Sequence, residues 1–232
     1  RGVMNPSFSS NSAAEPKAPG RGPAAVPPPQ DSWCRDHRGR RFSYDQALDL
    51  IRGFHGHLAP GLVIGVKMVS LATARLPRGV IFDALCETRS CLPDAVQLLT
   101  PCTIGNGWLR IVDLGRFAVA LYDKTDGSGV RVFIDAAKLQ AWPEFDAWLH
   151  KRKPKQEQDA ERLFAEIHAA GEGVLGVRAV RVAPRFLGKQ SKGPIAICPV
   201  CGEPYPLSTG GICKGCQGEA PYIPSGPEPA GT

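Results

Sequence analysis

Eight histidine and cysteine side chains have the types and spacing of metal ligands. In chain order they are His55, His57, Cys91 and Cys102, followed by Cys198, Cys201, Cys213 and Cys216. Imidazole nitrogen and thiolate sulfur are the donor atoms that zinc and other soft divalent metals prefer. The sequence therefore predicts two metal sites, one from the first four residues and one from the last four.

The downstream site consists of two C-x-x-C pairs, Cys198 with Cys201 and Cys213 with Cys216, separated by eleven residues. Four thiolates complete the tetrahedral coordination of zinc and leave no position for a substrate. A module this small has almost no core, so the metal would supply most of its folding free energy. We predict a structural zinc here; a redox dithiol pair, an iron–sulfur cluster and disulfides are the alternatives.

The upstream site carries a less specific signal. We predict His57, Cys91 and Cys102 as its core ligands, and His55 as either a further ligand or a group that orients one. Zinc is the expected divalent metal because mixed nitrogen and sulfur donors suit it. Three protein ligands with an open position would permit Lewis-acid chemistry or water activation, whereas a filled site would be structural. The sequence leaves both roles open.

Cys91 is also predicted to be reactive. It directly precedes Leu92-Pro93-Asp94, which has the composition of a helix start. A thiol at a helix N-terminus is favoured as a thiolate by the helix dipole and by free backbone N–H groups. We therefore expect a lowered pKa for this side chain.

Helical signals place the two histidines in a loop between helices. Ser43 and Gln46 form a capping box for a helix that reaches Phe54. A second helix is predicted over about residues 60–74, starting near Pro60 or Gly61. These two helices position the histidine loop.

The remaining elements predict an α+β fold. Strands are expected over 80–87, 130–134 and 174–182, a hairpin from 108–112 and 116–122, and helices over 90–99, 135–150 and 156–170. This order favours a helix-flanked antiparallel sheet domain rather than a βαβ series, followed by a small C-terminal zinc ribbon.

Composition divides the chain into four segments. Residues 1–40 begin with a stretch rich in Pro, Gly, Ala and Ser, and we predict that they are disordered. Residues 41–190 form the α+β metal-binding domain and residues 195–220 the ribbon. Residues 221–232 are again rich in Pro and Gly, which predicts a frayed tail.

Charge and hydropathy narrow the classes of function. The net charge of +6 is modest, and the densest basic run, His150–Lys155, has no interleaved aromatic residues, so we do not expect nucleic-acid binding. No apolar run approaches the roughly 18 residues of a membrane span, and the numbered chain starts without a signal pattern. We expect a soluble cytoplasmic protein that does not associate with membranes.

Four blocks resemble the FmdE family, which takes its name from a component of formylmethanofuran dehydrogenase. Phe54–Gly61 is similar to the F-H-G-H-x-C-P-G signature of that family, with Ala59 in place of the cysteine. Glu87–Gln97, Thr100–Gly107 and Asp113–Ala118 resemble the blocks that follow it. Members commonly end in a zinc ribbon, and the resemblance covers roughly residues 44–216.

The resemblance implies a zinc-binding accessory or partner-binding protein, related to molybdenum or tungsten enzymes of one-carbon metabolism. It implies an oxidoreductase of that type as a partner, and we also expect a homodimer. One alternative is a stand-alone metalloenzyme or cofactor-binding protein that uses the His/Cys site. A second alternative is a nucleic-acid-binding regulator that acts through the ribbon.

Overall fold

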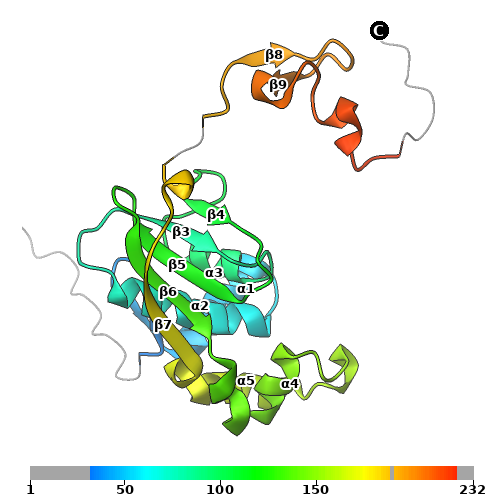
Figure 1. Cartoon of the computed structure of the whole chain (residues 1–232). Helices are drawn as coiled ribbons and strands as arrows, with labels where there is room; N and C mark the ends of the chain where they lie inside the picture. The colour runs from blue at the N-terminus through cyan, green and yellow to red at the C-terminus, as the bar shows by residue number, and fades with distance from the viewer. Residues whose placement is uncertain (1–31, 189–190, 224–232) are drawn as a thin grey trace, which may run out of the picture.

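The computed structural model describes residues 32–188 and 191–223. These residues form an α+β domain and a small C-terminal unit, which Figure 1 shows as separate bodies along the chain. We call residues 194–223 the C-terminal finger. The α+β architecture with an appended four-cysteine module confirms the predicted fold class.

A five-stranded sheet forms one layer of the domain. Its strand order is β4-β3-β5-β6-β7. The strands are β3 (Phe82–Cys86), β4 (Leu109–Ile111), β5 (Ala118–Asp123), β6 (Ser128–Ile134) and β7 (Leu175–Arg181). All neighbours are antiparallel except β3 and β4, which are parallel. The sheet is therefore mixed, which corrects the expectation of a purely antiparallel one.

The predicted hairpin between residues 108–112 and 116–122 is wrong. Strands β4 and β5 do not pair, because they lie on opposite sides of β3. The chain leaves β3, forms a helix and returns to a parallel neighbour, which is the crossover that parallel strands require. It then crosses to the other edge of β3.

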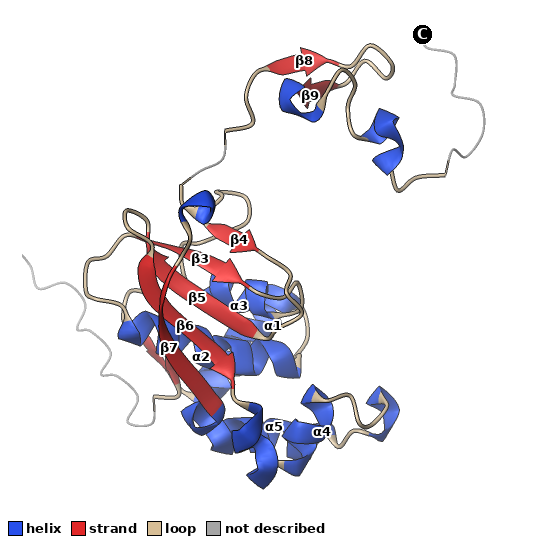
Figure 2. Cartoon of the chain, in the orientation of Figure 1, coloured by secondary structure: helices blue, strands red, loops and turns tan. Residues whose placement is uncertain are grey.

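Helices cover one face of this sheet, as Figure 2 shows. They are α1 (Tyr44–His55), α2 (Pro60–Arg75) and α3 (Leu92–Leu99), and α4 (Pro143–Leu149) and α5 (Ala160–Ala170) lie beyond the end of the sheet. Helix α2 is the central one, with eleven of its sixteen residues buried. It packs on α3 so closely that a Cβ built on Gly65 would lie 3.0 Å from the Cβ of Ala95.

The ends of α1 follow the local signals in the sequence. The Ser43 hydroxyl accepts a hydrogen bond from the Gln46 backbone at 3.3 Å, and the Gln46 side chain accepts one from the Ser43 backbone at 2.9 Å. These two contacts confirm the predicted capping box. Gly56 ends the helix in the left-handed region, at φ 81°.

Residues 32–40 are folded, which corrects the predicted boundary of the disordered segment. Strand β1 (Cys34–Arg35) pairs with β2 (Arg41–Phe42). Trp33 and Cys34 are buried, and the Trp33 ring packs edge-on against Tyr44 at 5.0 Å between centroids. A single aromatic anchor docks this hairpin, and an average over composition does not reveal it. Residues 1–31 and 224–232, for which disorder and a frayed tail are predicted, lie outside the described residues.

The predicted helix over residues 135–150 is interrupted. A 3-10 helix spans Ala136–Ala141, and α4 begins afresh at Pro143. Proline has no N–H to continue a helix but suits a first turn. Helix α5 begins at Ala160, later than predicted, because the Asp159 side chain caps it by accepting from the Arg162 backbone at 3.0 Å.

The helices were also compared with the requirements of a membrane span. Across residues 32–188 and 191–223, no single helix combines the necessary length and apolar composition. Only α1 and α2 taken together pass that test, and the chain bends by 116° between them.

Candidate functional site

The C-terminal finger brings its four predicted ligands together. Strands β8 (Ile195–Ile197) and β9 (Pro204–Pro206) form a hairpin that carries the first cysteine pair, and a short helical segment, Gly215–Glu219, follows the second pair. The four sulfur atoms all lie within 4.8 Å of one another. Cys201 Sγ and Cys213 Sγ are 3.7 Å apart. Zn–S bonds of about 2.3 Å give a tetrahedron with sulfur–sulfur edges of about 3.8 Å, so the thiols fit zinc.

Backbone amides support the charge of these thiols. The N–H of Cys213 points to Cys198 Sγ at 3.5 Å, and the N–H of Cys216 points to Cys213 Sγ at 3.4 Å. The first contact lowers the pKa of Cys198 to about 6. A hydrogen bond shared with the Cys213 sulfur raises the pKa of Cys216 to about 12. Four crowded thiols cannot all ionise alone, and a divalent cation is the group that lets them act together as ligands.

The upstream site is built around the end of α1 and the start of α3. His55 is the last residue of α1, and its Nδ1 lies 3.1 Å from a carboxylate oxygen of Asp94 in the first turn of α3. The His57 ring follows after Gly56, with its centroid 4.5 Å from that of His55. His55 is half-buried and His57 is exposed. The structure therefore brings two imidazoles and one carboxylate to one place at the surface.

Cys91 belongs to the same neighbourhood. It is the N-cap residue of α3, in the left-handed region at φ 47°, which is uncommon for a residue with a side chain. A Cβ built on Gly61, in the first turn of α2, would lie 3.1 Å from Cys91 Sγ, and the Leu62 backbone N–H donates to that sulfur. Cys91 therefore lies where the N-terminal ends of α2 and α3 meet.

The predicted lowering of the Cys91 pKa is wrong. Burial raises its pKa, and the nearby charge of Asp94 raises it further. Lys151 and the Leu62 N–H act in the opposite direction but do not prevail. The thiol is desolvated between two packed helices, and this cost outweighs the helix termini.

Cys102 lies away from the other three predicted ligands. It is fully buried beyond the C-terminal end of α3, and its thiol donates to the Phe82 carbonyl at 3.6 Å. Burial raises its pKa to about 11. Helix α3 has eight residues, so about 12 Å of helix separates Cys102 from Cys91. The structure does not bring them to one metal, and within residues 32–188 and 191–223 the finger thiols alone form a close metal-binding group.

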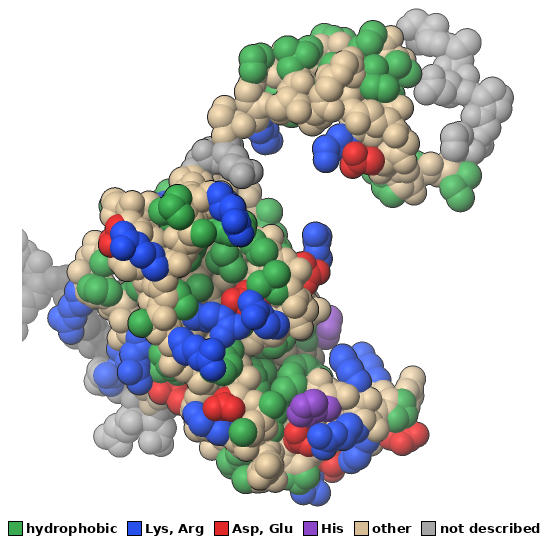
Figure 3. Space-filling model, in the orientation of Figure 1, with side chains coloured by type: hydrophobic (Ala, Val, Ile, Leu, Met, Phe, Trp, Pro, Cys, Tyr) green, Lys and Arg blue, Asp and Glu red, His purple; other side chains and the backbone are tan. Residues whose placement is uncertain are grey.

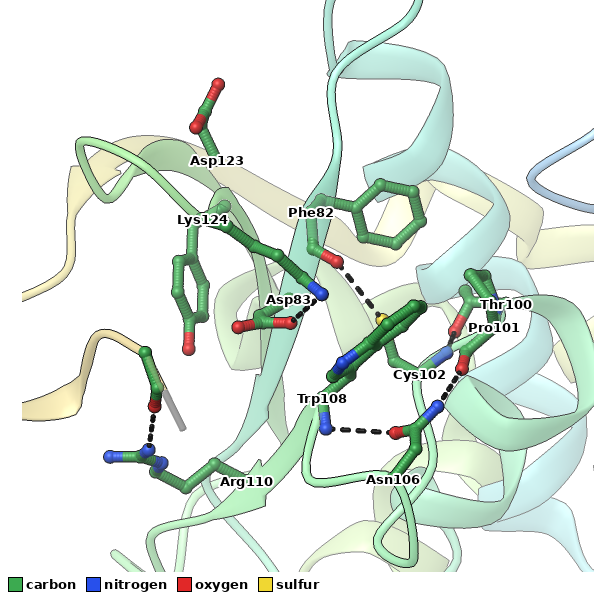
Figure 4. A network of polar contacts seen from close by, with 12 residues as sticks. Phe82, Asp83, Thr100, Pro101, Cys102, Asn106, Trp108, Arg110, Asp123 and Lys124 are labelled. Atoms are coloured by element: carbon green, nitrogen blue, oxygen red, sulfur yellow. Dashed lines mark hydrogen bonds and ion pairs between the residues drawn. The ribbon is translucent and has the colours of Figure 1, made fainter. Parts of the chain in front are cut away.

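The loop that carries Cys102 is held by a polar network (Figure 4). The Asn106 side chain donates to the Pro101 carbonyl at 2.8 Å and accepts from the Trp108 backbone at 2.9 Å. Lys124 lies 3.3 Å above the Trp108 ring and 3.1 Å from the carboxylate of Asp83. These contacts give the Thr100–Gly107 block a structural role.

Two members of the upstream site are difficult to find from the sequence. Asp94 has the pattern of a cap or surface group, although its place three residues after Cys91 puts both in one helical turn. Lys151 belongs to a solvated basic run, and no local pattern connects it with Cys91. Its influence on Cys91 depends on tertiary packing.

Two family models match this chain. Residues 54–183 match the family described as FmdE, Molybdenum formylmethanofuran dehydrogenase operon. This match spans more than half of the 232 residues. The chain belongs to the FmdE family. Residues 189–223 match the FmdE treble clef zinc finger, which agrees with the hairpin and helical segment that hold the four thiols.

Two relatives place this FmdE chain among known proteins. A protein of Archaeoglobus fulgidus named probable S-adenosyl-L-methionine-binding protein is 31% identical, over 71% of this chain and 50% of that protein. The chain thus spans about half the length of this relative. The crystal structure of an FmdE-like protein of tungsten formylmethanofuran dehydrogenase from Syntrophus aciditrophicus is 50% identical, with a TM-score of 0.73 over 82% of this chain and 99% of that one.

Proposed function

We propose that this FmdE protein is a zinc-dependent accessory protein that holds a second, exchangeable divalent metal at His55 and His57, with Cys91 beside them. The observation that carries this proposal is the 3.1 Å contact between His55 Nδ1 and Asp94. The permanent zinc belongs to the C-terminal finger, and the exchangeable metal belongs to the upstream site.

The His55–Asp94 contact has the form found around metal-binding histidines. A carboxylate only accepts, so Nδ1 carries the proton and Nε2 is left with a lone pair for a metal. His57 supplies a second imidazole at 4.5 Å between ring centroids. Such a nitrogen-rich set with one thiol suits zinc. Because Cys102 is remote, the protein supplies at most three strong donors here, which leaves a coordination position for an exchanging ligand.

The accessory role is supported by what the chain resembles and by its thiol chemistry. The matching family is described by a molybdenum formylmethanofuran dehydrogenase operon, and the solved relative is an FmdE-like protein of a tungsten enzyme. We therefore propose a molybdenum or tungsten oxidoreductase as the partner. All eight cysteines are free, which suits a reducing cytoplasmic setting.

The second candidate function is binding of S-adenosyl-L-methionine. The name of the Archaeoglobus fulgidus relative favours it, because the two chains align over 71% of this one. The same upstream site would then hold an organic ligand in place of a metal or beside one.

Cobalt substitution tests the proposal and separates the two candidates. Co²⁺ in the four-thiolate finger gives intense sulfur-to-metal charge-transfer bands, whereas a site rich in imidazole gives weaker visible bands at a second equivalence point. We expect the second equivalent to disappear in the His55→Ala/His57→Ala variant and to persist in Cys102→Ala, the matched control. A single equivalent in the wild type would contradict the proposal. Calorimetric binding of S-adenosyl-L-methionine that the histidine variant abolishes would favour the second candidate.

A further inference from the structure

We propose that a cavity at the other end of α3 from the histidine loop binds a phosphate-bearing small molecule. The cavity has a volume of about 380 Å³, within the usual range of ligand sites. Its charged and titratable lining residues are Arg35, Asp36, His37, Arg38 and Arg78. It lies outside the site proposed for metal, so the two proposals can fail independently.

Two segments far apart in the sequence build this cavity. One is the turn between β1 and β2, residues 36–40, and the other is the loop that follows α2, residues 76–80. The His37 backbone and its ring Nδ1 both bond to the Leu99 carbonyl at 3.0 Å, at the C-terminal end of α3. This double contact anchors the turn to the core, so the cavity has a fixed wall.

Three guanidinium groups in the lining have no opposing carboxylate. Arg35, Arg38 and Arg78 are exposed, and none of them forms an ion pair with a carboxylate in the part of the chain that the structure describes. Three like charges at one hollow repel one another unless an anion joins them. Guanidinium forks match the oxygen geometry of phosphate better than that of a monovalent anion.

The one carboxylate in the lining is already neutralised. Asp36 is almost fully buried, and Arg40 Nε donates to its Oδ2 at 2.6 Å. Its Oδ1 accepts from the backbone N–H groups of Arg38 and Arg40 at 2.9 and 3.0 Å. Asp36 therefore holds the turn in shape and leaves the positive charge of the cavity uncancelled.

Both walls also present bare backbone. Gly39 and Gly79 line the cavity with φ near +80°, and no atom lies within 4 Å of the position that a Cβ would occupy on either. The left-handed conformation explains why glycine suits these turns. The open space beside them lets a ligand approach the main chain between the arginines.

The test is calorimetric titration of the full, zinc-loaded chain with inorganic pyrophosphate. We expect one binding site per chain. The Arg38→Ala/Arg78→Ala variant should bind at least about ten-fold more weakly, since it loses two charge-assisted contacts. Arg178→Ala/Arg181→Ala, which removes two exposed arginines from β7, is the charge-matched control and should bind like the wild type. A thermal melt of each variant checks that the fold is retained.

Three results would overturn the proposal. The first is the lack of pyrophosphate binding by the wild type at low ionic strength. The second is an equal loss of affinity in the control, which would show only a general effect of net charge. The third is binding of a single-stranded oligonucleotide, but not of pyrophosphate, that depends on Arg38 and Arg78, because the cavity would then serve a nucleic acid rather than a small molecule.

Discussion

The contact between His55 and Asp94 is the smallest feature on which the function depends. Two short segments that are 39 residues apart meet through it, and it determines which imidazole nitrogen is available to a ligand. The carboxylate is only partly exposed, so water weakens the contact less than it would weaken a surface pair.

Replacing Asp94 with Asn should therefore weaken the upstream metal site specifically. An amide can hold the ring but does not raise its basicity as a carboxylate does. We expect a loss of about 10–100-fold in zinc affinity at this site, with the finger zinc unchanged. Competition with a chromophoric chelator measures both affinities, and equal affinities in variant and wild type would show that Asp94 only caps α3.

Glu87 provides a second prediction at single residues, and it concerns stability. Its carboxylate is almost fully buried and accepts hydrogen bonds from Arg131 at 2.7 Å, while Arg116 lies 2.8 Å away. The Arg131 hydrogen bond lowers the pKa of Glu87 below its ordinary value of 4.5. A carboxyl with a lower pKa in the folded chain stabilises the fold above the unfolded value and loses that contribution as the pH falls through the folded value.

The Glu87→Gln variant should consequently be less stable at pH 7, by on the order of 1–3 kcal/mol. Its stability should also fall less steeply than that of the wild type below about pH 4.5. Denaturant titrations at several pH values measure both effects. Parallel pH profiles for the two proteins would mean that Glu87 has the same pKa in the folded and unfolded chains.

The packing of α2 on α3 connects these residues to the fold. Gly61 contacts Cys91 and Gly65 contacts Ala95, so small residues on α2 determine how closely the N-terminus of α3 approaches the histidine loop. The Lys and Arg side chains that Figure 3 shows across the open face of the sheet lie on the opposite side from this packing. The site therefore depends on the helical layer.

A Gly65→Val substitution should separate the two helices. Its Cβ would lie 3.0 Å from Ala95 and 3.2 Å from Leu92, so the core would have to move. We expect a loss of about 1–3 kcal/mol in unfolding free energy. Gly53→Ala in α1 is the matched control, because nothing lies within 4 Å of that position, and it should stabilise by about 0.4–1 kcal/mol. Denaturant midpoints that respond alike to the two changes would refute this packing.

Local and non-local features of these elements differ in how well the sequence predicts them. The capping box at Ser43 and the start of α2 at Pro60 are predicted correctly, since each depends on neighbouring residues. The pairing of β4 and the separation of Cys102 from Cys91 are not, because each depends on where a crossover returns. For the same reason the finger is predictable: its ligands are close in sequence.

The whole chain consists of two units with different sources of stability. The α+β domain has a large apolar core. In the finger, among residues 191–223, only Cys198 and Tyr205 are buried. Exposed apolar residues on the finger, including Ile195, Ile197 and Val200, support our proposal that it docks on a partner or on a second copy of the chain.

Chelation should therefore unfold the finger and spare the domain. Without zinc, two buried residues cannot offset the entropy of ordering the finger. Limited proteolysis in the presence of a strong chelator should cleave within residues 194–223, while the thermal transition of the domain persists. Simultaneous loss of both units would mean that the finger is an integral part of the domain core.

Metal content per chain, determined by elemental analysis under anaerobic conditions without chelators, tests the central claim most directly. The measurement compares the wild type with His57→Ala, an exposed side chain whose loss should not disturb folding. We predict two zinc ions per wild-type chain and one in the variant. One zinc ion in both proteins would contradict the claim, because the finger alone would then bind metal.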